Sequence, residues 1–547
     1  MLALSLSGAS GLTFAAGTPA GRADVTTYHN DNQRTGANRS ERTLTLANVA
    51  PNTFGLLRRL PVDGVVDAQP LVLQAYPMGD GAEHDVVFVA TENASVYAFD
   101  TSSGKELWRR SLLPAGETAS DARDCAQVAP TIGVTATPVI DRGAGSLFVV
   151  AMSKTASTGA YHQRLHALSL ATGAESAQSA VDIAASVPGG GPGAVEGRIV
   201  FIPGQYKERS ALLLAGGVIY TSWASHCDIQ PYTGWIIAYD ERGLRQTAVF
   251  NTEPNGSVRG NSGEASFWNS NSGPAADTDG NIYAMTANGY FDAALSPLGF
   301  PSGGDYGNSI LKLGAPAGYA MAVLDYFTLY NANAESAADI DLGSGGLMLL
   351  PEQTDASGAT RHLAVGAGKD KNIYVVDRDH LGKFNSTSNH NAYQILADVF
   401  PHSRCGAGVY GAPVYFNGMV YFGPNGDVIQ GFRLVDARLP ATATTAAAAT
   451  TRSCYPGAPM SISADGTRNG ILWAVKNGSP QGILYAFDAN TLNSPLYDSS
   501  LAGARDQFGP GSKFTPPTVA NGLVFVATQA ADGRSAVAVF GLHSATP

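Results

Sequence analysis

The sequence predicts an all-β protein in the form of an eight-bladed β-propeller, and three observations support this prediction. A unit made of an apolar run, a short polar turn and an alternating run recurs eight times along the 547 residues. The chain contains 63 Gly and 30 Pro residues, a content typical of many turns between short strands. No helical 3.6-residue apolar period lies between the units. Eight four-stranded antiparallel units in a ring make an eight-bladed propeller.

The clearest unit spans 86–108, with the sequence VVFVATENASVYAFDTSSGKELW. Its three runs, separated by a polar turn and a Gly turn, predict three successive antiparallel strands. The corresponding third-strand positions in the eight units are Asp100, Ser169, Asp240, Lys312, Asp377, Arg433, Asp488 and Gly541. A spacing of roughly 50 to 70 residues exceeds a minimal blade of about 40 to 50 residues, so we expect inserted loops in every unit.

The units follow one another along the chain, and each begins with a short run expected to form its first strand. These runs are 68–72, 136–140, 210–214, 273–274, 345–350, 412–414, 458–460 and 516–519. Between the sixth and seventh units, the low-complexity stretch 441–451 (ATATTAAAATT) has little to pack and predicts a solvent-exposed connection.

The two ends of the chain predict how the ring closes. Residues 1–23 resemble a secretory signal peptide that lacks its charged leading segment, and 24–53 form a polar, aperiodic lead-in. The remaining 54–543 are expected to form one propeller domain. After 536–540 the eighth unit has no fourth strand, whereas 54–62 (FGLLRRLPV) is a strand-like run without a partner. We therefore predict that these two segments pair, so that an N-terminal strand closes the last blade. The lead-in is then expected at the blade edge, and deletion of 1–45 is expected to be tolerated.

The composition and the cysteines exclude some classes of function and indicate the cellular compartment. The net charge of -11 argues against a nucleic-acid or anionic-membrane partner, and no apolar run is long enough to span a membrane. None of the four cysteines forms a C-x-x-C pair, which excludes a zinc ribbon and a C-x-x-C-H haem site. Cys405 and Cys454 each precede the first strand of neighbouring blades, so a disulfide between them is expected in an oxidising compartment. Cys125 and Cys227 map to the same face.

Several motifs carry a family resemblance. The pattern AFD, then Gly, then Trp over 98–108 resembles the repeat of the pyrroloquinoline-quinone (PQQ)-like propellers, which include quinoprotein alcohol dehydrogenases and an outer-membrane assembly lipoprotein. YHNDNQRTGAN (28–38), IGVTATPVID (132–141) and GAGKDKNIYVVDR (366–378) resemble exported bacterial proteins known mainly by that similarity. The resemblance implies PQQ and calcium as candidate cofactors, and we expect neither haem nor a nucleotide. The adjacent cysteine pair of the dehydrogenases is missing, so no catalytic residue is carried over from them.

Propeller geometry predicts where a ligand site can lie. The loop between strands two and three of a blade and the loop before its first strand open on one face, around the central channel. Polar and aromatic residues on these loops are Gln69, Glu92, Asn93, Arg209, His226, Asp228, Glu264, Trp268, Asn269, Asn288, Asp341 and Lys369. A concave mouth with both charge signs and a Trp predicts a small-molecule or carbohydrate site.

Within this set, the candidate catalytic residues are His226, Glu264, Lys369 and Arg209, the candidate cofactor-binding residues are Trp268, Asn288 and Asn93, and the candidate metal ligand is Asp341. Each has a structural alternative. His226 could be a hydrogen-bonding loop residue, Lys369 a solvated turn residue, and Trp268 a seal of the channel. Arg209 and Glu264 could form an ion pair between blades. The only carboxylates that support a calcium loop are Asp339 and Asp341, and two carboxylates make a weak pattern for such a loop.

Three functions remain open from sequence. The first is a quinoprotein-type dehydrogenase of alcohols or sugars, in which Glu264 or Asp341 removes the substrate proton. The second is a carbohydrate-active lyase or hydrolase without a cofactor, with His226 as the base. The third is a binding or assembly propeller without catalysis, because a fold does not determine function.

Overall fold

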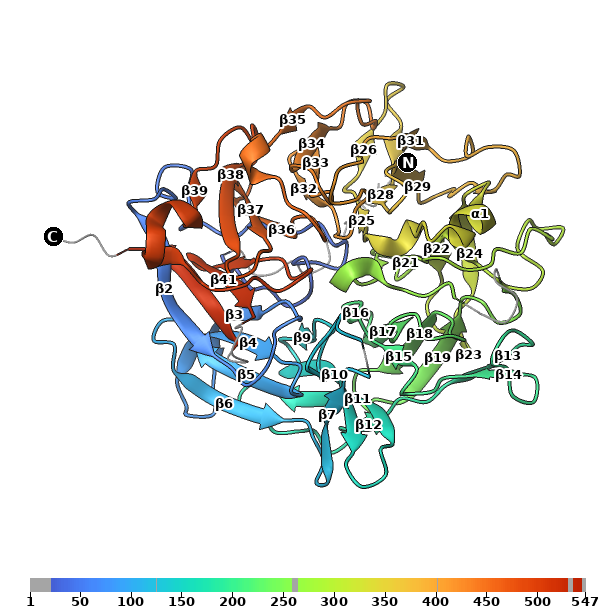
Figure 1. The fold of residues 1–547 in the computed structure, drawn as a ribbon, viewed down its shortest axis with the longest axis horizontal. Coiled ribbons are helices and arrows are strands. Elements are labelled where there is room, and N and C mark those ends of the chain that lie inside the picture. Colours follow the sequence, from blue (N-terminus) through green and yellow to red (C-terminus); the bar gives the residue numbers. More distant parts are fainter. Residues whose placement is uncertain (1–20, 124, 258–263, 401, 530–534, 544–547) are drawn as a thin grey trace, which may run out of the picture.

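The computed structural model describes residues 21–123, 125–257, 264–400, 402–529 and 535–543. Eight antiparallel sheets stand in a ring around a central axis, as Figure 1 shows, which confirms the predicted eight-bladed propeller. No helix in these residues is long and apolar enough to cross a membrane. Most of the predicted signal peptide falls on residues 1–20, outside the described residues.

The strands of each blade are given from the channel outward. Blade 1 has β3 (Leu71–Pro77), β4 (Glu83–Ala90), β5 (Ser95–Asp100) and β6 (Glu106–Ser111). Blade 2 has β9 (Val139–Asp141), β10 (Ser146–Thr155), β11 (Tyr161–Ser169) and β12 (Val181–Asp182). Blade 3 has β16 (Leu213–Ala215), β17 (Val218–Ser225), β18 (Trp235–Asp240) and β19 (Gln246–Asn251). Blade 4 has β20 (Ala275–Ala276), β21 (Ile282–Met285), β22 (Ser309–Leu313) and β24 (Val323–Thr328).

The second half of the ring continues in the same way. Blade 5 has β25 (Leu347–Leu349), β28 (Leu363–Ala367), β29 (Ile373–Asp377) and β31 (Gln394–Leu396). Blade 6 has β32 (Val414–Phe416), β33 (Met419–Phe422), β34 (Gln430–Arg433) and β35 (Thr445–Ala446). Blade 7 has β36 (Met460–Asp465), β37 (Arg468–Lys476), β38 (Ile483–Asp488) and β39 (Tyr497–Asp498). Blade 8 has β40 (Thr518–Ala520), β41 (Leu523–Thr528), β42 (Ala536–Leu542) and β2 (Phe54–Pro61).

Inserted elements account for the long spacing of the units. Short strands extend existing sheets: β1 (Ala37–Asn38), β7 (Glu117–Asp121), β8 (Thr131–Ile132), β15 (Tyr206–Lys207), β23 (Tyr319–Ala320) and β30 (Lys383–Phe384). Two separate hairpins are β13–β14 (Ser186–Pro188, Arg198–Val200) and β26–β27 (Gln353–Thr354, Thr360–Arg361). The helices are short: α1 (Ala332–Ala337) and the 3-10 turns η1 (Asn269–Asn271), η2 (Leu342–Ser344), η3 (Ala449–Thr451) and η4 (Ser499–Asp506).

The hydrophobic core lies between neighbouring blades. Every residue of β5 is buried, because both faces of an inner strand pack on the adjacent sheets. The Trp at the end of the first unit serves the same contact, since Trp108 donates a hydrogen bond from Nε1 to the carbonyl of Leu170 in blade 2, at 2.9 Å. The repeat signature is therefore a packing signature of the blade boundary.

The ring closes as the sequence predicts. Strand β2 pairs antiparallel with β42, in a register from Phe54 opposite Leu542 to Pro61 opposite Ala536. Figure 1 shows blue β2 beside the red strands of blade 8. Phe54 is fully buried and its ring centroid lies 4.9 Å from that of Tyr497 and 5.3 Å from that of Trp473. The two ends of the propeller are thus fastened in one sheet.

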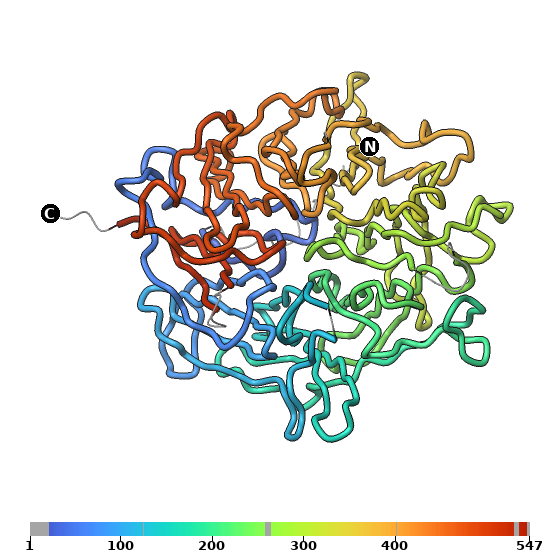
Figure 2. The backbone as a smooth tube through the Cα atoms, in the orientation of Figure 1, coloured from blue at the N-terminus to red at the C-terminus, as the bar shows by residue number. Residues whose placement is uncertain are grey.

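Most of the polar lead-in does not lie beside the closing strand at the outer edge of blade 8, so the prediction of its position is wrong. Residues 25–38, called the hub segment here, run through the central channel and bond to the innermost strand of every blade, as the blue tube near the centre of Figure 2 indicates. In order from blade 1 to blade 8, its hydrogen-bonded contacts are Val25 with Val72, Thr26 with Ile140, Asn32 with Leu214, Asn32 with Ala276, Gln33 with Leu349, Thr35 with Tyr415, Gly36 with Ile462 and Asn38 with Val519.

Most of these bonds use the backbone of the hub segment. Backbone bonds do not require apolar side chains at regular intervals, which explains why the sequence of this segment predicts a loop. Tyr28, His29 and Arg34 are each no more than 1% exposed. A deletion of residues 1–45 would remove all of these contacts, so the structure does not support the expectation that this deletion is tolerated.

The low-complexity stretch 441–451 is largely exposed, as predicted, but it also supplies part of a blade. Thr445 and Ala446 form β35, the outer strand of blade 6, and Ala447 and Thr451 are buried. A strand this short needs only backbone pairing with β34, so its composition gives no signal.

Candidate functional site

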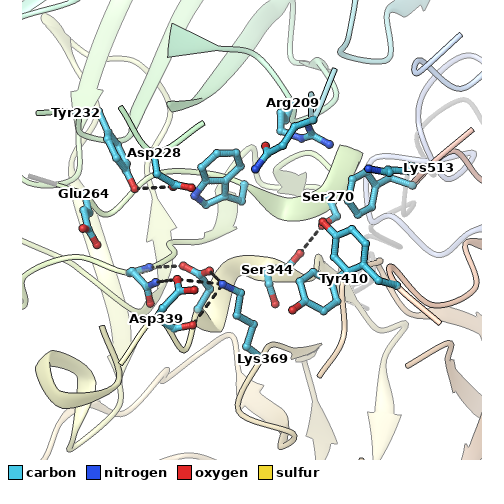
Figure 3. A pocket seen from close by; sticks show the side chains of 16 residues that line it. Arg209, Asp228, Tyr232, Glu264, Ser270, Asp339, Ser344, Lys369, Tyr410 and Lys513 are labelled. Atoms are coloured by element: carbon cyan, nitrogen blue, oxygen red, sulfur yellow. Dashed lines mark hydrogen bonds and ion pairs between the residues drawn. The ribbon is translucent and has the colours of Figure 1, made fainter. Parts of the chain in front are cut away.

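A cavity of about 480 Å³ opens at the channel face that carries the loops before the innermost strands, called the inner-strand loops here. Its lining residues, drawn in Figure 3, are Gln127, Arg209, Asp228, Tyr232, Glu264, Trp268, Ser270, Asn288, Asp339, Asp341, Ser344, Lys369, Tyr410, Tyr455, Lys513 and Phe514. A volume of this size suits a small molecule.

One side of the pocket holds a compact ion-pair network. Oδ2 of Asp341 lies 2.6 Å from Nζ of Lys369, and Oδ1 accepts a hydrogen bond from the backbone N–H of Asn288 at 2.9 Å. Asp339 accepts hydrogen bonds from Nζ of Lys369 and from Nδ2 of Asn288. The buried Oδ1 of Asn288 has no partner among the described residues, so the network has an acceptor left for a ligand.

The network shifts the acidity of both members of the central pair. Burial raises the pKa of Asp341, although Lys369 opposes this shift. Burial lowers the pKa of Lys369, but the carboxylates of Asp341 and Asp339 more than offset this and raise it above its usual value. Asp341 is thus a carboxylate with increased basicity beside a permanently charged ammonium, an arrangement suited to accepting a proton.

Aromatic rings form another side of the pocket. The Tyr410 and Tyr455 rings meet edge to face with centroids 5.0 Å apart, and Tyr455 meets Phe514 in the same way at 5.9 Å. The guanidinium of Arg209 lies 4.9 Å from the Phe514 centroid, and the ammonium of Lys513 lies 5.8 Å from that of Tyr455. This wall offers apolar contact together with positive charge.

Two further carboxylates lie near Tyr232. The Tyr232 hydroxyl donates to Oδ1 of Asp228 at 3.2 Å, and Nε2 of Gln230 donates to Oε1 of Glu264 at 2.6 Å. In Figure 3, Glu264, Asp228 and Asp339 lie toward one side and Lys513 toward the other. The pocket therefore has an acidic end and a cationic, aromatic end.

Comparison with known proteins agrees with this architecture. The family model described as outer membrane protein assembly factor BamB, a PQQ-repeat model, matches residues 32–156 and 82–202. The quinohemoprotein alcohol dehydrogenase from Comamonas testosteroni is 15% identical with a TM-score of 0.62, over 96% of this chain and 82% of that one. The chain has the fold of a PQQ-like repeat β-propeller, and residues 32–202 match the repeat model itself. The name describes the repeat and not a bound cofactor.

Other solved structures share the fold of this PQQ-like propeller. A europium-containing methanol dehydrogenase is 12% identical with a TM-score of 0.58, over 95% of this chain and 98% of that one. The quinohemoprotein alcohol dehydrogenase ADHIIG from Pseudomonas putida HK5 is 12% identical with a TM-score of 0.59, over 95% and 80%. No curated protein sequence matches this chain. Identities this low show the fold alone.

The propeller brings together six of the eight candidate residues. Arg209, Glu264, Trp268, Asn288, Asp341 and Lys369 all line the pocket, whereas His226 and Asn93 do not. His226 is fully buried, and its Nε2 lies 3.0 Å from the carbonyl of Ala122. Asn93 bonds to the carbonyl of Asp63 and to the Thr131 hydroxyl.

Several lining residues escaped the sequence analysis although a signal was present. Tyr410, Tyr455 and Phe514 each stand two or three residues before a Pro-containing run that opens blade 6, 7 or 8. The position that predicted Trp268 therefore also predicts these three aromatic residues. If the aromatic residues of the inner-strand loops are included, the sequence also predicts the aromatic wall of the pocket.

Both pairs of cysteines form disulfides beside the pocket. Cys405 bonds to Cys454 as predicted, and Cys125 bonds to Cys227. Each bridge joins two loops that carry lining residues: Tyr410 and Tyr455 for one, Gln127 and Asp228 for the other. The disulfides therefore brace the pocket wall.

The lining fits a planar organic anion better than a metal ion. Trp268 and the aromatic wall offer ring faces, and Arg209 and Lys513 offer positive charge. Among the described residues, no group of three or more His, Cys, Asp or Glu side chains is placed to hold a metal ion. The two carboxylate oxygens of Asp341 already contact Nζ of Lys369 and the backbone N–H of Asn288. The role of Asp341 as a calcium ligand therefore stays a prediction.

Proposed function

We propose that the central pocket binds a planar, carboxylated quinone of the PQQ type and that the protein is an exported dehydrogenase of alcohols or sugars. The observation that carries the proposal is that the Asp341–Lys369 pair and the aromatic, cationic wall line the same pocket. The shared fold with quinoprotein alcohol dehydrogenases supports it. The two disulfides support a site of action in an oxidising compartment.

The roles of the chain's own residues follow from the geometry. Bound PQQ would supply the two-electron oxidant. The Asp341 carboxylate takes the proton of the substrate hydroxyl, and the raised pKa of this buried group makes it a stronger base at neutral pH. Lys369 stabilises the negative charge that develops as the proton leaves, and Trp268 provides a stacking surface.

Cofactor binding is tested first. PQQ, with and without calcium, should raise the melting temperature of the purified protein, and dye reduction should then appear with an alcohol or aldose. No thermal shift at saturating PQQ would overturn the proposal.

Two matched variants test the base. Asp341 is 9% exposed and Asp339 is 71% exposed, although both pair with Lys369. Asp341→Asn should lower the PQQ-dependent turnover by about 10²- to 10⁴-fold, the usual contribution of a general base. Asp339→Asn should change turnover only a few-fold. Equal losses in both variants would mean that the ion-pair network, and not Asp341 as a base, supports activity.

A second candidate function is carbohydrate binding without a cofactor. The edge-to-face wall of Tyr410, Tyr455 and Phe514 favours it, since aromatic faces bind sugar rings. Saturable binding of an oligosaccharide, together with no response to PQQ, would support this alternative.

A further inference from the structure

Arg209 is a buried cation with a hydrogen-bond donor, Nη1, that no described residue of the protein uses. Its side chain lines the central pocket, yet the residue is only 6% exposed. Its Nη1 has no hydrogen-bond partner among the described residues. A guanidinium removed from water without compensating bonds is costly, so native structures normally supply a partner for it. That partner can come from a ligand.

Other positive charges lie close to Arg209. Lys513 lines the same pocket, and the aromatic rings of Phe514 and Tyr455 connect the two cations through contacts at 4.9, 5.9 and 5.8 Å. Two residues before Arg209, Lys207 is 1% exposed, and its buried ammonium also lacks a hydrogen-bond partner in the described part of the chain. Burial, and next the charge of Arg209, lower the pKa of Lys207 to about 7.

The carboxyl groups described nearby bond to other partners and not to Nη1 of Arg209 or Nζ of Lys207. Burial raises the pKa of Glu92 to about 8, and its Oε2 accepts the N–H of Gly133 at 2.8 Å. Asp67 accepts the Ser512 hydroxyl at 2.7 Å, and Asp228 accepts the Tyr232 hydroxyl. Glu92, Asp67 and Asp228 act on the charge of Lys207 through space, but no group in the described part of the chain forms a hydrogen bond with Nζ of Lys207 or Nη1 of Arg209.

We propose that Arg209 and Lys513 form a carboxylate-binding subsite, backed by Lys207 and walled by Phe514 and Tyr455. The ligand class is a planar ring that carries at least one carboxylate, because the ring lies along the aromatic wall while the carboxylate meets the guanidinium. The proposal rests on the central pocket as the ligand site of the proposed function, but not on the ligand being a quinone.

The test measures the dissociation constants of four probes by calorimetry. Pyridine-2,6-dicarboxylate is a planar dianion, pyridine-2,6-dicarboxamide is its neutral counterpart, malonate is a dianion without a ring, and PQQ is the proposed cofactor. The wild-type protein should bind the planar dicarboxylate at least 10-fold more tightly than the dicarboxamide or malonate. Equal affinities, or no binding of the dicarboxylate at millimolar concentration, would overturn the subsite.

Substitutions locate the anion. Arg209→Met should weaken dicarboxylate binding by about 10- to 100-fold, as expected for the loss of a charge-assisted hydrogen bond. Arg209→Lys should weaken it less, and Lys513→Met, at a half-buried position, should weaken it several-fold. Lys371→Met is the control, because Lys371 pairs with Asp398 and lies outside the pocket. Melting temperatures verify folding, and Lys513→Met remains informative if Arg209→Met does not fold.

The outcomes separate this subsite from the quinone proposal. Binding of the dicarboxylate through Arg209 with no binding of PQQ would support the subsite and overturn the quinone. Equal PQQ affinity in the wild type and in Arg209→Met would support the quinone and overturn the subsite.

Discussion

At the scale of single residues, burial decides which titratable groups can serve the pocket. His226 is fully buried, and burial lowers its pKa to about 4, so the ring is neutral at pH 7. A neutral imidazole that lies 3.0 Å from the carbonyl of Ala122 donates its Nε2 proton there. This bond and the Cys125–Cys227 disulfide connect the same two loops. The position favours a role in holding the pocket wall.

The pKa of His226 predicts a loss of stability in acid. Between pH 6.5 and pH 4 the unfolded chain binds a proton that the folded protein excludes, so the free energy of unfolding falls as the pH falls. His226→Gln should reduce the loss between pH 7 and pH 5 by about 1–2 kcal/mol. Denaturant titrations at the two pH values measure this difference. His402→Gln, at an exposed position, should leave the loss unchanged, and the same loss in wild type and His226→Gln would contradict the assignment.

At the scale of elements, β2 connects the first part of the propeller to the last blade. Its first residue, Phe54, packs against Trp473, Tyr497 and Phe540, and so contacts both blade 7 and blade 8. The strand covers the outer edge of β42, which would otherwise be open to pairing with another chain.

Truncation of Phe54 tests this closure. Phe54→Ala should lower the free energy of unfolding by about 3–5 kcal/mol, because the cavity lies in a packed aromatic cluster. Asn52→Ala, two residues earlier and exposed, should change it by less than about 0.5 kcal/mol. Chemical denaturation and light scattering of the two variants give the answer. Equal stability would show that β2 contributes little to closing the ring.

The elements also show why some predictions succeeded. The eight units and β2 carry alternating or continuous apolar runs, which record their burial in the sequence. The hub segment and β35 bond mainly through backbone groups, and any residue has those groups, so their sequences carry little record of the contacts. In the pocket, position on the two kinds of loop that open on the channel mouth identified seven lining residues, namely Asp228 and the six candidate residues. The pairing of Asp341 with Lys369 and the edge-to-face contact of Tyr455 with Phe514 depend on side-chain distances that only the fold sets.

At the scale of the whole molecule, Arg34 connects the hub segment to two neighbouring blades, 3 and 4. It is fully buried and donates to the carbonyls of Pro274, Tyr28 and Leu212 and to the Thr27 hydroxyl. Burial lowers its pKa to about 10, so the guanidinium remains charged at neutral pH. Its bonds hold the hub against blades 3 and 4.

Loss of Arg34 should therefore weaken the whole ring. Arg34→Met leaves buried carbonyls without donors and should lower the free energy of unfolding by about 3–5 kcal/mol. Arg39→Met removes an exposed guanidinium near the ring of Phe416 and should lower it by no more than about 1 kcal/mol. Thermal denaturation compares the two. Similar melting temperatures for both variants would contradict a central role for the hub segment.

The hub segment also has a consequence for the order of events during folding. Residues 25–38 are synthesised before any blade, yet Asn38 bonds to Val519, 481 positions later in the chain. Contacts over such separations form slowly, because the loop they close is long. The earliest described residues can therefore settle only after the last blade has been made. Until then the inner edges of the ring have no partner, and the nascent chain must be kept from aggregating for the full time of its synthesis.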